Sequence, residues 1–214
     1  MTRQLTRRIL AVAVFAIAFA FVESSVVVYL RALYYPDGFS FPLRQMSALH
    51  VAVELVREGS TIVMLAYVGL LAGGSRWQKF AYFALAFGVW DIFYYAWLKI
   101  VLDWPSSVLD LDILFLIPSP WIGPVIAPVL VAALMIAAGL FILRSEEHHG
   151  PFRTSLADWI LAMIGTVAIL LSFIIDTDAG IRFRPPQPYH FEIFAVGMIF
   201  SVAALVNSLR KHSA

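Results

Sequence analysis

The stretch Ile9–Leu30, ILAVAVFAIAFAFVESSVVVYL, decides the fold class of this chain. It contains 22 residues, and Glu23 is its only charged side chain. A helix crosses the hydrocarbon core of a bilayer with about 20 mainly apolar residues. We therefore expect a first membrane-spanning helix here. We also expect it to be retained, although the arginines before it resemble the start of a signal peptide.

The rest of the chain has the same character. Of its 214 residues, 61% are apolar and 14% are charged, whereas soluble domains have about 45–50% and about 25%. The sequence therefore predicts an all-α polytopic integral membrane protein, a bundle of about six transmembrane helices that forms a single domain over residues 1–214. Five later segments are long and apolar enough to be the other spans: Ser47–Leu71, Phe80–Leu102, Trp121–Leu143, Trp159–Ile175 and Phe191–Leu209.

A proline-rich stretch precedes the fourth of these spans. The apolar run Ile113–Ile117 is followed by Pro118, Pro120, Pro124 and Pro128. Proline lacks the backbone N–H and clashes with the preceding helical turn, so a regular helix cannot run through this stretch. We expect a broken or re-entrant segment here, surrounded by protein or by a wet cavity. The alternative is a kinked start of the fourth helix.

The short loops predict the orientation, because Lys and Arg accumulate on the cytoplasmic side. If both termini are cytoplasmic, nine cations lie inside and four lie in the outer loops. We therefore expect an integral protein of a bacterial inner membrane with both termini in the cytoplasm. The inner cations are Arg3, Arg7, Arg8, Arg76, Lys79, Arg144, Arg153, Arg210 and Lys211, and the outer ones are Arg31, Arg44, Arg182 and Arg184.

Ionisable residues within the spans gather in the outer half of the predicted bundle. At about 100° per residue, the polar residues of the second span share one face, and so do those of the third. Charges are costly in hydrocarbon, so both faces should turn inward, toward each other and toward Glu23. The predicted polar pocket contains Glu23, His50, Glu54, Arg57, Glu58, Asp91, Tyr94, Tyr95 and Lys99.

This pocket suits acid–base chemistry on a molecule that enters from the membrane. Glu54, Glu58 or Asp91 is the candidate general base, and Tyr95, or its neighbour Tyr94, is the candidate proton donor. Arg57 would hold an anionic group of the substrate.

A metal centre is a second hypothesis, since helical bundles hold di-metal sites with inward-facing carboxylates. It would bind a divalent metal such as iron or zinc, although the usual Glu-x-x-His pairs are absent from these spans. A haem between His50 and His190 is a weaker alternative, and Glu146–His149 is interpreted as a solvated turn. The candidate metal ligands are Glu23, His50, Glu54, Glu58 and Asp91.

The leading hypothesis for function is a membrane-embedded enzyme or redox protein that acts on a lipid, an isoprenoid or a quinone from the extracytoplasmic side. Three alternatives stay open: a proton- or cation-coupled transporter, a non-catalytic subunit of a membrane complex, and buried ion pairs that only set helix registry. Expected partners are membrane lipids, an amphipathic small molecule, and another membrane protein or a second copy. The net charge of +1 gives no basic surface for nucleic acid. The absence of cysteine excludes disulfides and iron–sulfur clusters.

Overall fold

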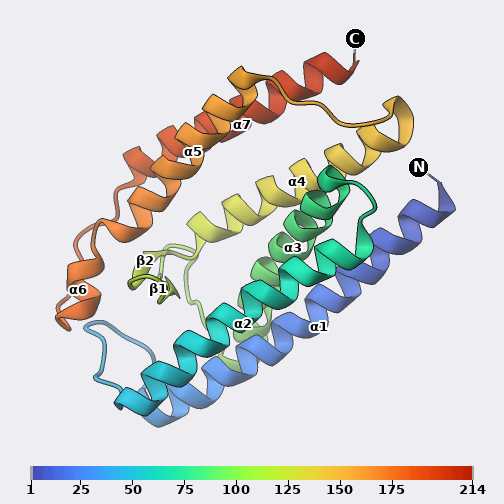
Figure 1. Ribbon diagram of the computed structural model, residues 1–214. Helices are drawn as coiled ribbons and strands as arrows, with labels where there is room; N and C mark the ends of the chain where they lie inside the picture. The colour runs from blue at the N-terminus through green and yellow to red at the C-terminus, as the bar shows by residue number, and fades with distance from the viewer. Residues whose placement is uncertain (1, 214) are drawn as a thin grey trace.

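The computed structural model describes residues 2–213, and they form long helices joined by short loops and one small sheet (Figure 1). Within these residues, six helices are long and apolar enough to cross a membrane, which confirms the six predicted spans in length and composition. The long helices are α1 (Arg3–Tyr34), α2 (Ala48–Ala72), α3 (Arg76–Leu102), α4 (Ile126–His149), α5 (Leu156–Ile174) and α7 (Phe191–Ser213). The shorter elements are β1 (Leu111–Phe115), β2 (Trp121–Pro124) and α6 (Thr177–Ile181).

Polar residues at the ends of the apolar runs define where the helices begin. Thr2, Ser47, Ser75 and Ser155 are N-caps whose hydroxyl oxygens accept a hydrogen bond from a backbone N–H of the first turn. Such a bond satisfies one of the donors that have no partner within the helix. The helix α3 ends at Leu102, and its C-cap residue Asp103 adopts the left-handed conformation. The helices therefore extend a few residues beyond the apolar runs, into polar sequence.

The helix α3 is the centre of the larger of two groups of helices. It packs against α1, α2 and α4, whereas α5 and α7 pack mainly against each other. The pair of α5 and α7 joins the rest through contacts of α7 with α4 and of α5 with the sheet (Figure 1). The helix α1 begins and α7 ends at the same end of the bundle, which we call the terminal end; the opposite end, with β1 and β2, is the hairpin end.

Small residues allow α3 and α4 to pack closely. A Cβ on Gly88 would lie 2.5 Å from the carbonyl oxygen of Ala132, and one on Gly139 would lie 2.6 Å from that of Ala81. Helices in a membrane associate through such close packing, because lipid tails are as apolar as the helices themselves.

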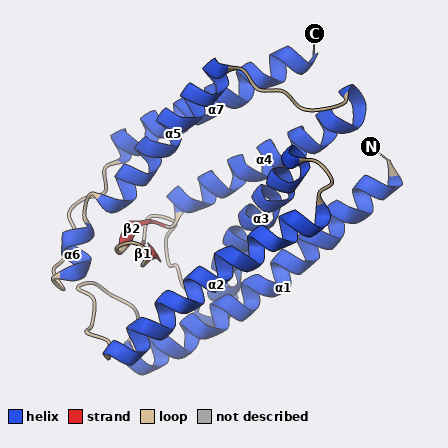
Figure 2. Ribbon diagram, viewed as in Figure 1, coloured by secondary structure: helices blue, strands red, loops and turns tan. Residues whose placement is uncertain are grey.

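The proline-rich stretch before α4 forms an antiparallel β-hairpin (Figure 2). Leu111 pairs with Pro124, and the register shifts between Ile113 and Phe115. The alternative of a kinked helix start is wrong, because α4 begins at Ile126 rather than at the expected Trp121. The segment is not helical because a residue before proline favours extended backbone, so the chain here satisfies its hydrogen bonds by strand pairing.

Candidate functional site

Arg57 joins α2 to α1 through two buried carboxylates. Its Nε and Nη2 atoms lie 2.8 and 2.7 Å from Oε2 of Glu54, one turn earlier on α2. Its Nη1 atom pairs with Oε1 of Glu23 on α1. The hydroxyl of Thr61 donates to the other oxygen of Glu23 at 3.0 Å. The guanidinium thus lies between two carboxylates, and its fork geometry suits such a pairing.

Glu58 connects the same helix to the hairpin. Its carboxylate is buried, and it accepts a hydrogen bond of 2.8 Å from the backbone N–H of Leu116 and a second from that of Ile117. These two donors lie in the turn after β1, where proline prevents the regular ladder. The proline-rich turn is therefore held against α2 by a carboxylate and not by apolar packing alone.

A second ion pair lies between α1 and β1. Nη2 of Arg31 is 3.3 Å from Oδ1 of Asp112, and both side chains are buried. The guanidinium carbon of Arg31 lies 3.7 Å from the centre of the Trp104 ring and 4.5 Å from that of Phe39. An arginine over aromatic faces gains cation–π attraction in addition to its ion pair. Tyr95 of α3 completes the group by hydrogen bonding to Asp112.

Tyr94 lies between the two ion pairs. It interacts electrostatically with Arg57 of the first pair and with Arg31 of the second. Its ring contacts that of Tyr95 at a centroid distance of 4.9 Å. Asp91, one turn earlier on α3, interacts with Asp112, and its Oδ2 atom is buried without a hydrogen-bond partner among residues 2–213. The two ion pairs and the residues around them form one neighbourhood, which we call the carboxyl cluster.

The carboxyl cluster holds more acids than cations. Burial raises the pKa of Asp112 to about 6, although Arg31 acts in the opposite direction. With more carboxyls than arginines in a buried place, ionising all of the acids at once is unfavourable, because a buried charge without a partner is costly. The cluster consists of the five acids Glu23, Glu54, Glu58, Asp91 and Asp112, the two cations Arg31 and Arg57, and the tyrosines Tyr94 and Tyr95.

Two predicted pocket residues lie elsewhere. The ammonium group of Lys99 is 2.7 Å from Oδ1 of Asp103 and also donates to two backbone carbonyls. The Lys99 side chain is 50% exposed, because its long flexible stem reaches past the end of α3. His50 lies in the first turn of α2. Its Nδ1 atom is hydrogen-bonded to the hydroxyl of Tyr34 of α1 rather than to a carboxylate. The spacing of about 100° per residue placed both residues on the inward face, but it could not show what the polar atoms of their side chains contact.

The geometry gives no support to a metal centre. No group of three or more His, Asp or Glu residues in the described part of the chain could hold a metal ion. Among the proposed ligands, Glu23 and Glu54 pair with Arg57, so a guanidinium stands where a metal ion would have to bind. The two histidines proposed for haem also have different partners, since His190 bonds to Glu192 at 2.8 Å and His50 to a tyrosine. We therefore derive no chemistry through a metal or a haem.

Arg31 and Asp112 were not among the site residues expected from the sequence, because both were assigned to the outer loops. One signal for Arg31 was present: it follows Glu23 by eight residues, which places the two within about 80° on a helix. Asp112 had only the alternation of Leu111, Asp112 and Ile113, a strand pattern at the edge of a segment assigned to an outer loop.

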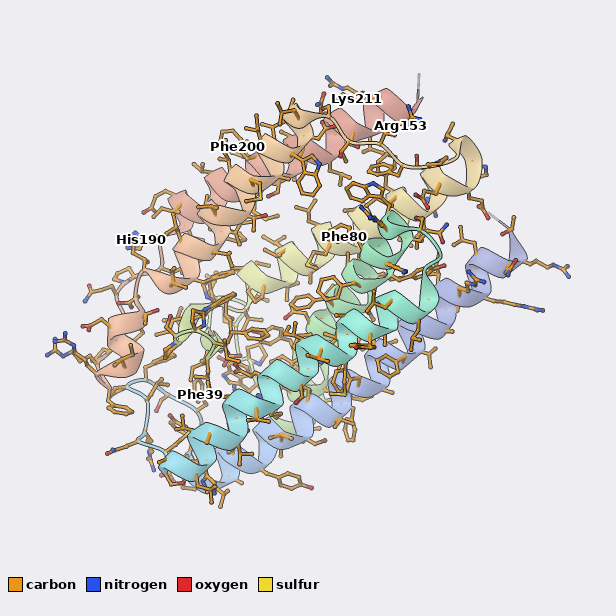
Figure 3. All side chains as sticks on the ribbon, in the orientation of Figure 1. Phe39, Phe80, Arg153, His190, Phe200 and Lys211 are labelled. Atoms are coloured by element: carbon orange, nitrogen blue, oxygen red, sulfur yellow. The ribbon has the colours of Figure 1, made fainter. Side chains whose placement is uncertain are left out.

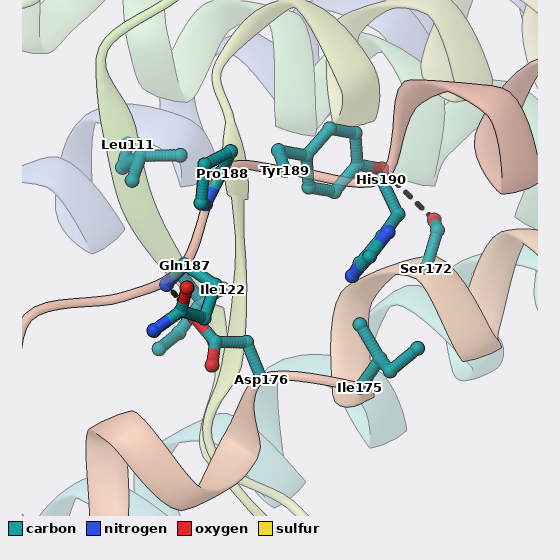
Figure 4. A pocket seen from close by; sticks show the side chains of 9 residues that line it. All are labelled: Leu111, Ile122, Ser172, Ile175, Asp176, Gln187, Pro188, Tyr189 and His190. Atoms are coloured by element: carbon teal, nitrogen blue, oxygen red, sulfur yellow. Dashed lines mark hydrogen bonds between the residues drawn. The ribbon is translucent and has the colours of Figure 1, made fainter.

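A small cavity lies beside the hairpin, between β1, β2 and the segment that precedes α7 (Figure 4). Its volume is about 10 Å³, which is room for about one water molecule. The hydroxyls of Ser172 and Tyr189 are bonded at 2.8 Å on its wall. This cavity is too small for an organic substrate.

Comparison of the chain with models of protein families, with curated proteins and with solved structures finds no match.

Proposed function

We propose that this chain is an integral membrane protein in which the carboxyl cluster binds the polar headgroup of an amphipathic molecule and exchanges protons with it. The proposal corresponds to the metal-free enzyme among the hypotheses from sequence. The observation that carries it is Arg57, a guanidinium held between two buried carboxylates yet still 20% exposed.

Arg57 is suited to bind an anionic or carbonyl oxygen. A guanidinium has five N–H donors in a planar fork, and only part of this capacity is used by Glu23 and Glu54. On α2, Val53 and Val56 near Arg57 are exposed, so this part of the helix faces the acyl chains in a bilayer. A headgroup with an apolar tail would therefore approach Arg57 from within the membrane rather than from water.

The surplus of carboxyl groups supports proton exchange. Glu54, Glu58 and Asp91 are the groups that would hold or release a proton beside a bound headgroup, and Tyr94 and Tyr95 would donate hydrogen bonds to it. Glu58 also bonds to the turn of the hairpin, and Asp112, in β1, pairs with Arg31 of α1. In this proposal the hairpin is the re-entrant segment that covers the cluster from the side expected to be extracytoplasmic.

A proton-coupled transporter is the second candidate, and the packing of the helices favours it. The pair of α5 and α7 packs mainly on itself, so it is the part that could move against α1–α4. In the half of the bundle toward the terminal end, the spans carry no acidic residue at comparable depth. The stretch Leu130–Met135 of α4, for example, is entirely apolar. We therefore place the transporter second.

The test uses the molecule that copurifies with the protein. The organic extracts of wild type, Arg57→Gln and Arg57→Lys, each purified in mild detergent, are compared by mass spectrometry. Arg44→Gln is the matched control, since Arg44 is an exposed arginine in the loop before α2. We expect one amphipathic species enriched with wild type and with Arg44→Gln, reduced with Arg57→Lys and lost with Arg57→Gln. The same extract from all four folded proteins would refute the role of Arg57.

Infrared spectroscopy tests the protons separately. A protonated carboxyl group absorbs apart from a carboxylate, so buried acids that keep their protons give a signal at neutral pH. We expect Glu54→Gln, Glu58→Gln or Asp91→Asn to remove part of this signal. A wild-type spectrum without protonated carboxyl groups would contradict the proton exchange.

A further inference from the structure

A basic groove lies at the terminal end of the bundle, far along the helices from the carboxyl cluster. It is about 450 Å³ in volume, which lies within the range of about 300–1,000 Å³ for small-molecule sites. Figure 3 labels two of its residues, Arg153 and Lys211, at this end of the molecule. The groove is lined by His149, Pro151, Arg153, Thr154, Ser155 and Lys211.

The lining is positively charged. Two of its six residues are permanent cations, one is a histidine, and none is acidic. Asp158 is buried, and both of its carboxylate oxygens lie 3.0 Å from Nζ of Lys211. Arg153 is exposed, and no carboxylate within 4 Å pairs with it in the part of the chain that the structure describes. The guanidinium of Arg153 is therefore available for an external anion.

The acids of the neighbouring turn bind other donors. Glu146 accepts hydrogen bonds from the hydroxyl of Ser75 and the backbone N–H of Phe152 at 2.7 and 3.2 Å. Glu147 accepts from the backbone N–H and the hydroxyl of Thr2. The first turn of α5 is also closed by its own capping box of Ser155 and Asp158. The anion-binding capacity of the groove therefore comes from its basic side chains and not from a free helix end.

Aromatic side chains place this groove at a membrane surface. The ring of Trp77 lies 5.1 Å from that of Phe152 and 6.0 Å from that of Trp159, measured between centroids. Trp159 is 51% exposed, one turn along α5 from Ser155 in the groove wall. Tryptophan at the end of a spanning helix lies at the level of the lipid headgroups.

We propose that this groove binds the phosphate of an anionic phospholipid, with Arg153 as the main ligand and His149 beside it. The ammonium group of Lys211 already donates to Oγ of Ser155 and to both carboxylate oxygens of Asp158, so its three N–H donors are occupied. Basic pockets at the ends of spanning helices recognise such headgroups. The exposed face of Trp159 would then contact the glycerol and upper acyl chains. A free phosphate ion would use the same basic side chains but would gain nothing from the tryptophan.

The test measures lipid binding to purified protein in detergent by native mass spectrometry. The probes are palmitoyl-oleoyl phosphatidylglycerol and, as the neutral lipid, palmitoyl-oleoyl phosphatidylcholine. We expect wild type to prefer phosphatidylglycerol, and we expect Arg153→Gln to bind it at least about ten-fold more weakly, because a hydrogen bond to a charged group is lost. Arg153→Lys should keep most of the preference, because the charge is retained.

Arg210→Gln is the matched control, since Arg210 is an exposed arginine near the same end that does not line the groove. It should change the affinity by less than about two-fold, as expected of a solvent-screened charge that does not line the groove. Equal losses in Arg153→Gln and Arg210→Gln, or equal binding of the two lipids by wild type, would overturn the proposal. Saturable binding of inorganic phosphate that depends on Arg153, without a preference between lipids, would overturn the assignment to a lipid.

Discussion

Arg57→Ala tests whether the carboxyl cluster is held together by one guanidinium. The substitution removes the pairs with Glu23 and Glu54 and leaves both carboxylates buried. Breaking a buried ion pair by removing one partner costs about 3–5 kcal/mol, because the remaining charge has no compensation. For a chain of this size, about 1 kcal/mol corresponds to about 2–4 °C in Tm. We therefore expect Tm to fall by about 6–20 °C.

The measurement is thermal unfolding of the purified protein in detergent, with Arg44→Ala as the matched control. Arg44 is exposed and its guanidinium carbon lies 5.7 Å from the centre of the Tyr35 ring, so its loss should cost at most about 1 kcal/mol. Adding Glu23→Gln and Glu54→Gln to Arg57→Ala should restore much of the lost stability, since the stranded charges are then gone. An Arg57→Ala protein that unfolds within about 1 °C of wild type, or a triple variant that is no more stable than Arg57→Ala, would refute the reasoning.

Three further outcomes are expected. Because burial raises the pKa of Asp112 to about 6, the folded protein binds this proton more tightly than the unfolded chain, so stability falls as pH rises through that value. Between about pH 5 and about pH 7.5 the loss should be about 1.4 kcal/mol larger in wild type than in Asp112→Asn, because the other acids of the carboxyl cluster are present in both; equal pH profiles of Tm would contradict this. Gly165→Ala should destabilise the protein despite the better helix propensity of alanine, since its Cβ would lie 2.2–2.9 Å from atoms of α7, whereas Gly59→Ala in open space should gain up to about 1 kcal/mol; thermal unfolding of both variants should show opposite signs. As the chain has no native cysteine, a cysteine at Asp37 should react with an impermeant maleimide in intact cells and one at His148 should not, and the reverse pattern would overturn the predicted topology.

The inward face of α2 was predictable because it depends on local periodicity alone. Glu54 and Glu58 are one turn apart, and both are buried on that face. Arg57 shares it and pairs with Glu54. The helical period also placed Tyr95 inward on α3, where it is buried. These assignments need only the geometry of one helix and the cost of a charge in hydrocarbon.

The partners of these residues were not predictable in the same way. Lys99 and His50 lie on inward arcs of their helices, yet their tips bind Asp103 and Tyr34, at the loop ends of the spans. The polar atoms of these side chains lie beyond Cβ and can point in another direction. The position of a residue on the helix face therefore does not determine what its side chain contacts.

The sequence by itself determined six helices long and apolar enough to cross a membrane, since about 20 apolar residues in a row have few places other than a bilayer in which to be buried. Only the tertiary structure decided that the proline-rich stretch is a hairpin, that Glu58 bonds to its turn, and that Arg31 pairs with Asp112. The last pair joins residues 81 positions apart. Hydropathy and periodicity describe one segment at a time. Pairs between distant segments are selected by how the helices pack, so they follow from the folded arrangement alone.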